Sequence, residues 1–283
     1  GWGKRLRWPD DYFQLNAELA YTRYMMKDWN YFSLMTNGNC NNFALTLALS
    51  RHSLDNQIYP RKGSELLMSV SVTPPYSLWD GKDYANLANN PNSSSYNREL
   101  QEKYSWIEYH KWKFKFRNFT ALSNHDKCFV LMTRAEVGML GSYNKHKPSP
   151  FENYYMGGDG TSGYSSIYST ETIGLRGYED GALDPSSYYS VAYNKYTMEL
   201  RYPVIMKPQS SIYVLGFLEG GNGFNSWKEF SPFKIKRSAG VGVRLFLPIV
   251  GMLGIDWGWG FDPAYGKTER SGSQFHFVMG QQL

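Results

Sequence analysis

The stretch Gly254-Ile255-Asp256-Trp257-Gly258-Trp259-Gly260-Phe261 alternates between large apolar residues and small or polar ones. Side chains of an extended strand point alternately to opposite faces, so one face would carry Ile, Trp, Trp and Phe and the other Gly, Asp, Gly and Gly. The same two-residue period recurs in 195–202 and in 109–117, where lysines alternate with tryptophan and phenylalanine. This period predicts β-strands as the main structural units.

Outward from that stretch, the pattern predicts about eleven strands and no convincing helix. The predicted strands are 1–7, 12–24, 43–50, 65–73, 109–117, 128–139, 195–202, 211–219, 236–247, 254–261 and 274–281. Their connections alternate between short ones, such as 203–210 and 247–252, and long ones, such as 74–104 and 140–190. Segment 81–101 is rich in Asn and Ser, which predicts an exposed mobile loop.

The composition favours strands that cross a membrane. Aromatic residues reach 17% and charged residues are only 19%. The mean hydropathy is −0.51, and no apolar run is long enough for a helix that spans a membrane. The apolar faces run along nearly whole strands, which distinguishes the chain from a soluble sandwich and matches strands that cross a bilayer at a tilt. The sequence therefore predicts an antiparallel transmembrane β-barrel, with polar side chains facing the lumen. These are Lys111, Lys113, Lys115, Glu199 and Arg201.

Residues that often carry chemistry form no recognisable motif. The net charge of +5 is mild and the basic residues are scattered, so no nucleic-acid partner is expected. Cys40 and Cys128 lie far apart and outside any zinc or redox pattern, and we interpret them as single small residues near strand starts. No hydrolase motif accompanies the five histidines, so we expect no enzyme, no cofactor and no metal site.

Segment 140–190 is too long for an inert hairpin loop. Within it, Arg176 lies between Gly174 and Gly177, and glycines allow a backbone to approach a wall closely. A guanidinium placed there could bind carboxylates of the two following strands, Glu199 and Glu219, and hold the loop inside the barrel. On spacing alone, the alternative is that Arg176 is one basic residue among many on a solvated loop.

At this point the residues resemble a known family. Gly174-Leu175-Arg176-Gly177-Tyr178 resembles the motif in the sixth external loop of the BamA family of outer-membrane barrel insertases and its superfamily, and Tyr154-Tyr155-Met156-Gly157-Gly158 is similar to the aromatic segment that precedes this motif. The remaining matches run through essentially the whole chain, in the family's order. They are Tyr59-Pro60-Arg61-Lys62-Gly63, Ser238-Ala239-Gly240-Val241-Gly242-Val243-Arg244 with Pro248, Gly254-Ile255-Asp256-Trp257 and Gln274-Phe275-His276-Phe277-Val278-Met279-Gly280.

The resemblance implies that Arg176, Gly177 and Tyr178 form a motif pinned in the lumen, where Arg176 contacts Glu199 and Glu219. The family barrel has about sixteen strands, so residues 1–283 are expected to be the C-terminal portion of a barrel. Upstream strands and periplasmic repeat domains would then be absent from this chain, and segment 140–190 would be its long lumen-inserted external loop.

The resemblance also implies an integral protein of the cell outer membrane. As the central subunit of the barrel assembly machinery, it would fold and insert outer-membrane proteins through a lateral seam by β-augmentation. Its partners would be nascent outer-membrane proteins, accessory assembly lipoproteins, other outer-membrane subunits and outer-membrane lipids. The alternatives are a protein-secreting pore of the same superfamily or, more remotely, a passive porin-like barrel.

The closing strand 274–283 is the expected seam strand. Its apolar face is short, and a glycine within a strand weakens its pairing, so both features should loosen the seam and thin the adjoining bilayer. The residues expected to do this are Phe275, Phe277, Met279 and Gly280.

Overall fold

Eleven strands form one antiparallel sheet in the computed structural model, which describes residues 1–283 except 29–34, 126, 161–169, 186–188, 208–209 and 281–283. The order in this described part is β1-β2-β3-β4-β5-β6-β9-β10-β11-β12-β13. The strands are β1 (Trp2–Arg5), β2 (Phe13–Met26), β3 (Gly38–His52), β4 (Lys62–Val72), β5 (His110–Ala121), β6 (Val130–Gly141), β9 (Ala192–Lys207), β10 (Ser210–Phe224), β11 (Lys236–Leu247), β12 (Gly251–Pro263) and β13 (Arg270–Met279). The predicted all-β antiparallel fold with about eleven strands is therefore confirmed.

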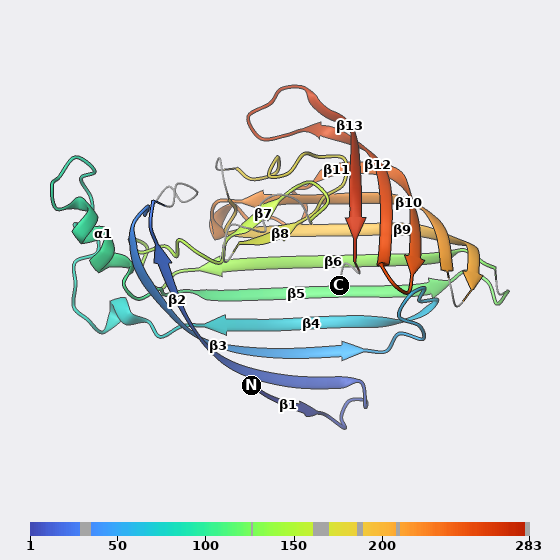
Figure 1. Ribbon diagram of the computed structural model, residues 1–283, viewed down its shortest axis with the longest axis horizontal. Helices are drawn as coiled ribbons and strands as arrows, with labels where there is room; N and C mark the ends of the chain where they lie inside the picture. The colour runs from blue at the N-terminus through green and yellow to red at the C-terminus, as the bar shows by residue number, and fades with distance from the viewer. Residues whose placement is uncertain (29–34, 126, 161–169, 186–188, 208–209, 281–283) are drawn as a thin grey trace.

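The sheet curls so that β12 and β13 lie in front of the middle strands, and β1 and β13 form its two ends (Figure 1). The two-residue period decides which side chains face outward. In β12, the side chains of Ile255, Trp257 and Phe261 are 39–52% exposed, whereas that of Asp256 is fully buried. The outer face is thus apolar and the inner face polar, as a barrel in lipid requires.

The long connection between β6 and β9 lies on the concave side of the sheet (Figure 1). It contains two short parallel strands, β7 (Tyr154–Met156) and β8 (Glu171–Ile173), and β7 contacts β9 and β10. Buried apolar residues of this connection share one core with residues of β3 and β9. Segments 161–169 and 186–188 of the predicted loop 140–190 lie outside the described residues.

The expectation of no helix is wrong. Helix α1 (Tyr96–Tyr104) forms within and just beyond segment 81–101, which was predicted to be an exposed mobile loop. Leu100 and Tyr104 lie one turn apart and are buried in the same core as Cys40 of β3. Burial of the helix face that carries Leu100 and Tyr104 stabilises α1, although the Asn- and Ser-rich sequence before it does not predict a helix. Two single-turn 3-10 helices, η1 (Tyr76–Leu78) and η3 (Trp227–Glu229), occupy other external connections.

The predicted seam strand also needs a correction. Strand β13 ends at Met279, so Gly280 follows the strand instead of interrupting it. Gly280 has a φ of +81°, and its N–H donates to the carbonyl oxygen of Met252 of β12 at 2.8 Å, just past the end of β13. It therefore cannot weaken the pairing from within, and residues 281–283 lie outside the described part.

Two other features bear on function. Cys40 and Cys128 are both buried free thiols, and each lies near the start of a strand, β3 and β6, as predicted. Within the described ranges, no helix is long and apolar enough to cross a membrane.

Candidate functional site: a loop tip bound to the inner face of the sheet

Arg176 is buried at the tip of the long loop and binds three carboxylates. Its Nη2 donates to Glu199 Oε1 at 2.7 Å and to Glu219 Oε1 at 2.8 Å, and its Nη1 donates to Asp256 Oδ2 at 3.2 Å. Its backbone N–H donates to the other oxygen of Glu219 at 2.8 Å. The guanidinium also lies over the ring of Phe217, 3.7 Å from the centroid. The structure thus brings together Arg176, Glu199 and Glu219, the three residues predicted to contact one another.

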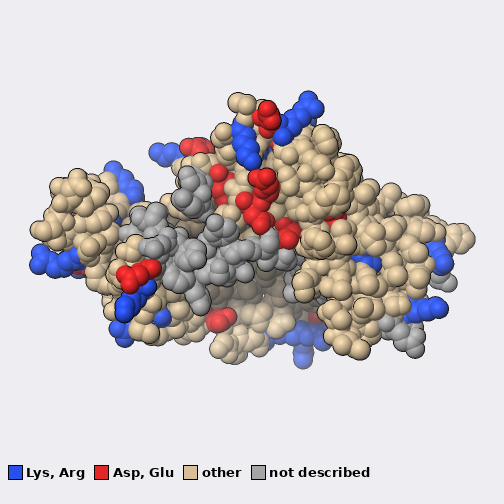
Figure 2. Space-filling view, turned by 45° about the horizontal axis from the view of Figure 1, so that its top comes forward, with Lys and Arg blue, Asp and Glu red and all other residues tan. Residues whose placement is uncertain are grey.

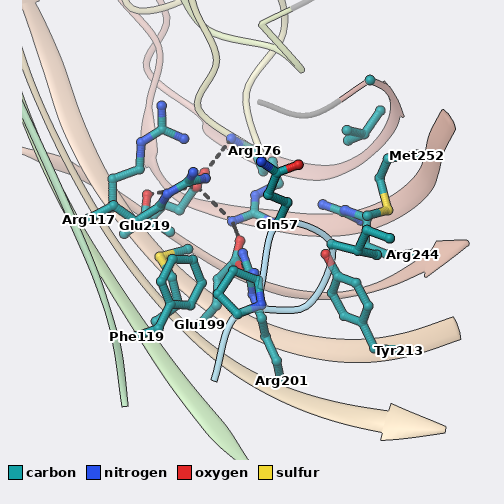
Figure 3. Close-up of a pocket in the computed structure, with 17 residues that line it drawn as sticks. Gln57, Arg117, Phe119, Arg176, Glu199, Arg201, Tyr213, Glu219, Arg244 and Met252 are labelled. Atoms are coloured by element: carbon teal, nitrogen blue, oxygen red, sulfur yellow. Dashed lines mark hydrogen bonds and ion pairs between the residues drawn. The ribbon is translucent and has the colours of Figure 1, made fainter. Parts of the chain in front are cut away.

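The carboxylates have other cationic partners, so the cluster is a network and not an isolated pair. Arg201 Nε donates to Glu199 at 2.8 Å, and Arg244 binds Asp256 through both terminal nitrogens at 2.6 and 2.7 Å. Figure 3 shows Arg176 close to Glu199 and Glu219. These three residues line a cavity of about 80 Å³. A buried charge is tolerated when it is paired and hydrogen-bonded in this way.

The charge of Arg176 is secured by its neighbours. Burial alone would lower the pKa of the guanidinium, but the carboxylates of Glu219, Glu199 and Asp256 outweigh burial and raise the pKa above its ordinary value. The loop tip therefore carries a permanent positive charge, attracted to an acidic part of the inner face.

Gly177 and Tyr178 extend the attachment beyond Arg176. The N–H of Gly177 donates to Nε2 of His276 at 2.8 Å, and the hydroxyl of Tyr178 donates to the carbonyl oxygen of Arg237 at 2.8 Å. Gly177 has a φ of +88°, a conformation that favours glycine. The backbone also fits closely against β12, because a Cβ added to Gly258 would lie 2.8 Å from the nitrogen of Gly177.

A second cluster anchors the loop further upstream, at β5. Glu171 of β8 lies 2.5 Å from Lys113, 3.4 Å from Lys115 and 3.5 Å from Lys111, and Lys111 also lies 3.1 Å from Glu152. Burial would raise the pKa of Glu171, but the three lysines, Lys113 foremost, lower it to about 2. The lysines predicted to face the lumen therefore bind carboxylates of the loop.

Several residues of the site were not singled out from the sequence. Asp256 and Gly258 lie on the polar side of the predicted strand 254–261, and no partner is predicted for either of them. His276 belongs to the family-like stretch 274–280, again without a predicted partner, and Glu171 is not singled out. The available signal was alternation, which places Asp256 and His276 on the inner faces of their strands but does not say what they bind.

Figure 2 shows how charged side chains are distributed on one face of the molecule. Acidic side chains gather over the middle of this face, and most Lys and Arg side chains lie at its periphery. Among the described residues, no group of three or more His, Cys, Asp or Glu side chains is arranged to hold a metal ion.

Comparisons with known proteins agree with this architecture. The chain is similar to BamA from Haemophilus ducreyi, in a crystal structure lacking POTRA domains 1-3, with a TM-score of 0.62 and 17% identity. The match covers 95% of this chain and 51% of that one, so the chain spans about half the length of that BamA. A comparison with curated proteins finds no match. The family model described as "Omp85 superfamily domain" matches residues 6–283, nearly the whole chain, and this chain therefore belongs to the Omp85 superfamily.

Proposed function

We propose that this chain is the C-terminal part of an outer-membrane barrel that folds and inserts other outer-membrane proteins. The observation that carries the proposal is the loop tip Arg176-Gly177-Tyr178, bound to the inner face of a sheet with an apolar outer face. Membership of the Omp85 superfamily and the BamA-like fold support the same function.

The proposed mechanism uses strand addition and no catalytic residue. Strand β13 is an end strand of the sheet among the described residues, and an end strand offers main-chain donors and acceptors to an incoming strand. Because these are backbone groups, they bind strands of many sequences, which an insertase with many substrates requires. The outward side chains of β13 would contact lipid, since Phe275, Phe277 and Met279 are 65–69% exposed. Their short apolar row would thin the bilayer locally.

The bound loop has a defined role in this mechanism. It ties the inner faces of the C-terminal strands to one another, so the end of the sheet keeps its shape while its outer edge takes up a substrate strand. The proposed partners are nascent outer-membrane proteins, accessory assembly lipoproteins, other outer-membrane subunits and lipids, and the proposed location is the cell outer membrane.

The test is depletion of the full-length protein in its native bacterium, with quantitative proteomics of the outer membrane and of the medium. We expect many unrelated barrel proteins to fall together and their unfolded precursors to accumulate in the periplasm. Arg176→Ala should restore assembly less well than wild type, whereas Arg98→Ala, which removes an exposed arginine of helix α1, should restore it fully.

The secretion-pore alternative gives a different result in the same experiment. If barrel proteins stay at normal levels while one exported protein disappears from the medium, the insertase proposal is wrong and a secreting pore is favoured. If neither pool changes on depletion, both proposals are wrong.

A further inference from the structure

The loop tip is hydrogen-bonded to five consecutive strands of the sheet. Arg176 reaches Glu199 of β9, Glu219 of β10 and Asp256 of β12. The remaining two strands are reached by its neighbours, β11 by Tyr178 through a backbone carbonyl and β13 by Gly177. One short segment therefore connects the middle of the sheet to its last strand.

The contact with β13 depends on one side chain. His276 is only 6% exposed and lies on the inner face, between the outward-facing Phe275 and Phe277. Its Nε2 accepts the N–H of Gly177 at 2.8 Å. The opposite side of β13 has no neighbouring strand among the residues that the structure describes. Among the described residues, strand β13 is thus held by its ladder to β12 and by this hydrogen bond from the loop.

We propose that His276 is a positioning residue through which the bound loop tip holds strand β13 in place. The N–H of Gly177 is buried against β12, so losing its acceptor would leave a donor unpaired. The loop and the strand therefore stabilise each other. Release of the loop should loosen β13, and loss of the acceptor should loosen both.

The biological meaning of this contact rests on the proposed function, in which the loop motif would act on strand β13. If β13 accepts substrate strands, His276 makes the mobility of that strand depend on whether the loop is bound. The physical coupling between the loop tip and β13 does not itself depend on what the barrel inserts.

The experiment is hydrogen exchange with mass spectrometry on the full-length protein in micelles, without substrate. His276→Leu should raise exchange about tenfold in β13 and in the loop tip, and leave β2–β4 unchanged. His276→Gln should restore protection, because its Oε1 lies about as far along the side chain as Nε2. The shorter His276→Asn should not. Phe277→Leu, on the outward face, is the matched control and should leave the loop tip unchanged.

Coupling is measured by combining two variants. Arg176→Ala should raise exchange in β13, but should add little in a chain that already carries His276→Leu, because both changes break one connection. The inference is overturned if His276→Leu leaves β13 as protected as wild type, if His276→Gln exchanges as fast as His276→Leu, or if the two variants act additively. Insertion into vesicles, measured separately, tests the proposed function, and its failure would leave the exchange result intact.

Discussion

The most direct prediction concerns Arg176→Ala, which removes the central cation of the loop site. Breaking a buried ion pair costs about 3–5 kcal/mol when the partner charge is left uncompensated. Here each of the three carboxylates keeps a second cation, so we expect the lower end, about 3 kcal/mol, or roughly a hundredfold in the bound-to-released ratio of the loop. The second cations are Arg201, Arg244 and Lys195.

The assay is limited proteolysis of the full-length protein in micelles, with the cleavage sites read by mass spectrometry. Wild type should resist cleavage within 174–181, and Arg176→Ala should be cleaved there at least tenfold faster. Arg176→Lys should be intermediate, because an ammonium cannot bind carboxylates through the planar fork of a guanidinium. Arg98→Ala is the matched control, since it removes an exposed arginine of helix α1 that lies outside the loop and its attachment sites.

One outcome of the proteolysis assay would show that Arg176 does not hold the loop. If the strands of the Arg176→Ala barrel keep their wild-type protease resistance and segment 174–181 is cleaved no faster than in Arg98→Ala, the charge cluster does not hold the loop. The proposed function would then lose the observation that carries it.

Three further predictions concern other residues that hold the loop in place. Glu171→Gln should weaken the attachment to β5 by about 2 kcal/mol and raise hydrogen exchange in β8, because three lysines lose their shared carboxylate; unchanged exchange would contradict this. Gly258→Ala should weaken loop binding by about 1–3 kcal/mol, again measured by hydrogen exchange, because the added Cβ would collide with the loop backbone. Gly216→Ala is the control, because its Cβ would meet only one atom, at 3.9 Å. Burial raises the pKa of Asp184 to about 7, despite opposing hydrogen bonds. The bound loop therefore holds this proton more tightly than the released loop does. Protection of the loop should fall as the pH rises from about 4 to 7, and it should level off at higher pH. Asp184→Asn should remove that part of the pH dependence, and an identical pH profile in both chains would disprove the assignment.

The strands and their faces are determined largely by the sequence. A two-residue period is a local property, and in lipid the outward side of every strand must be apolar, so alternation alone indicates the fold and the direction of each side chain. Glu199 and Glu219 were found in the same way, because they lie on inner faces of strands that directly follow the loop carrying Arg176.

Other features depend on where distant strands lie in space. Asp256 and His276 reach the loop tip because the antiparallel register of β10 to β13 and the curl of the sheet bring them to one place, and no local pattern encodes that distance. Helix α1 forms because Leu100 and Tyr104 are buried in the core that includes Cys40, which lies far away in the sequence. Alternation determines which way a side chain points, whereas the curvature of the sheet decides what it touches.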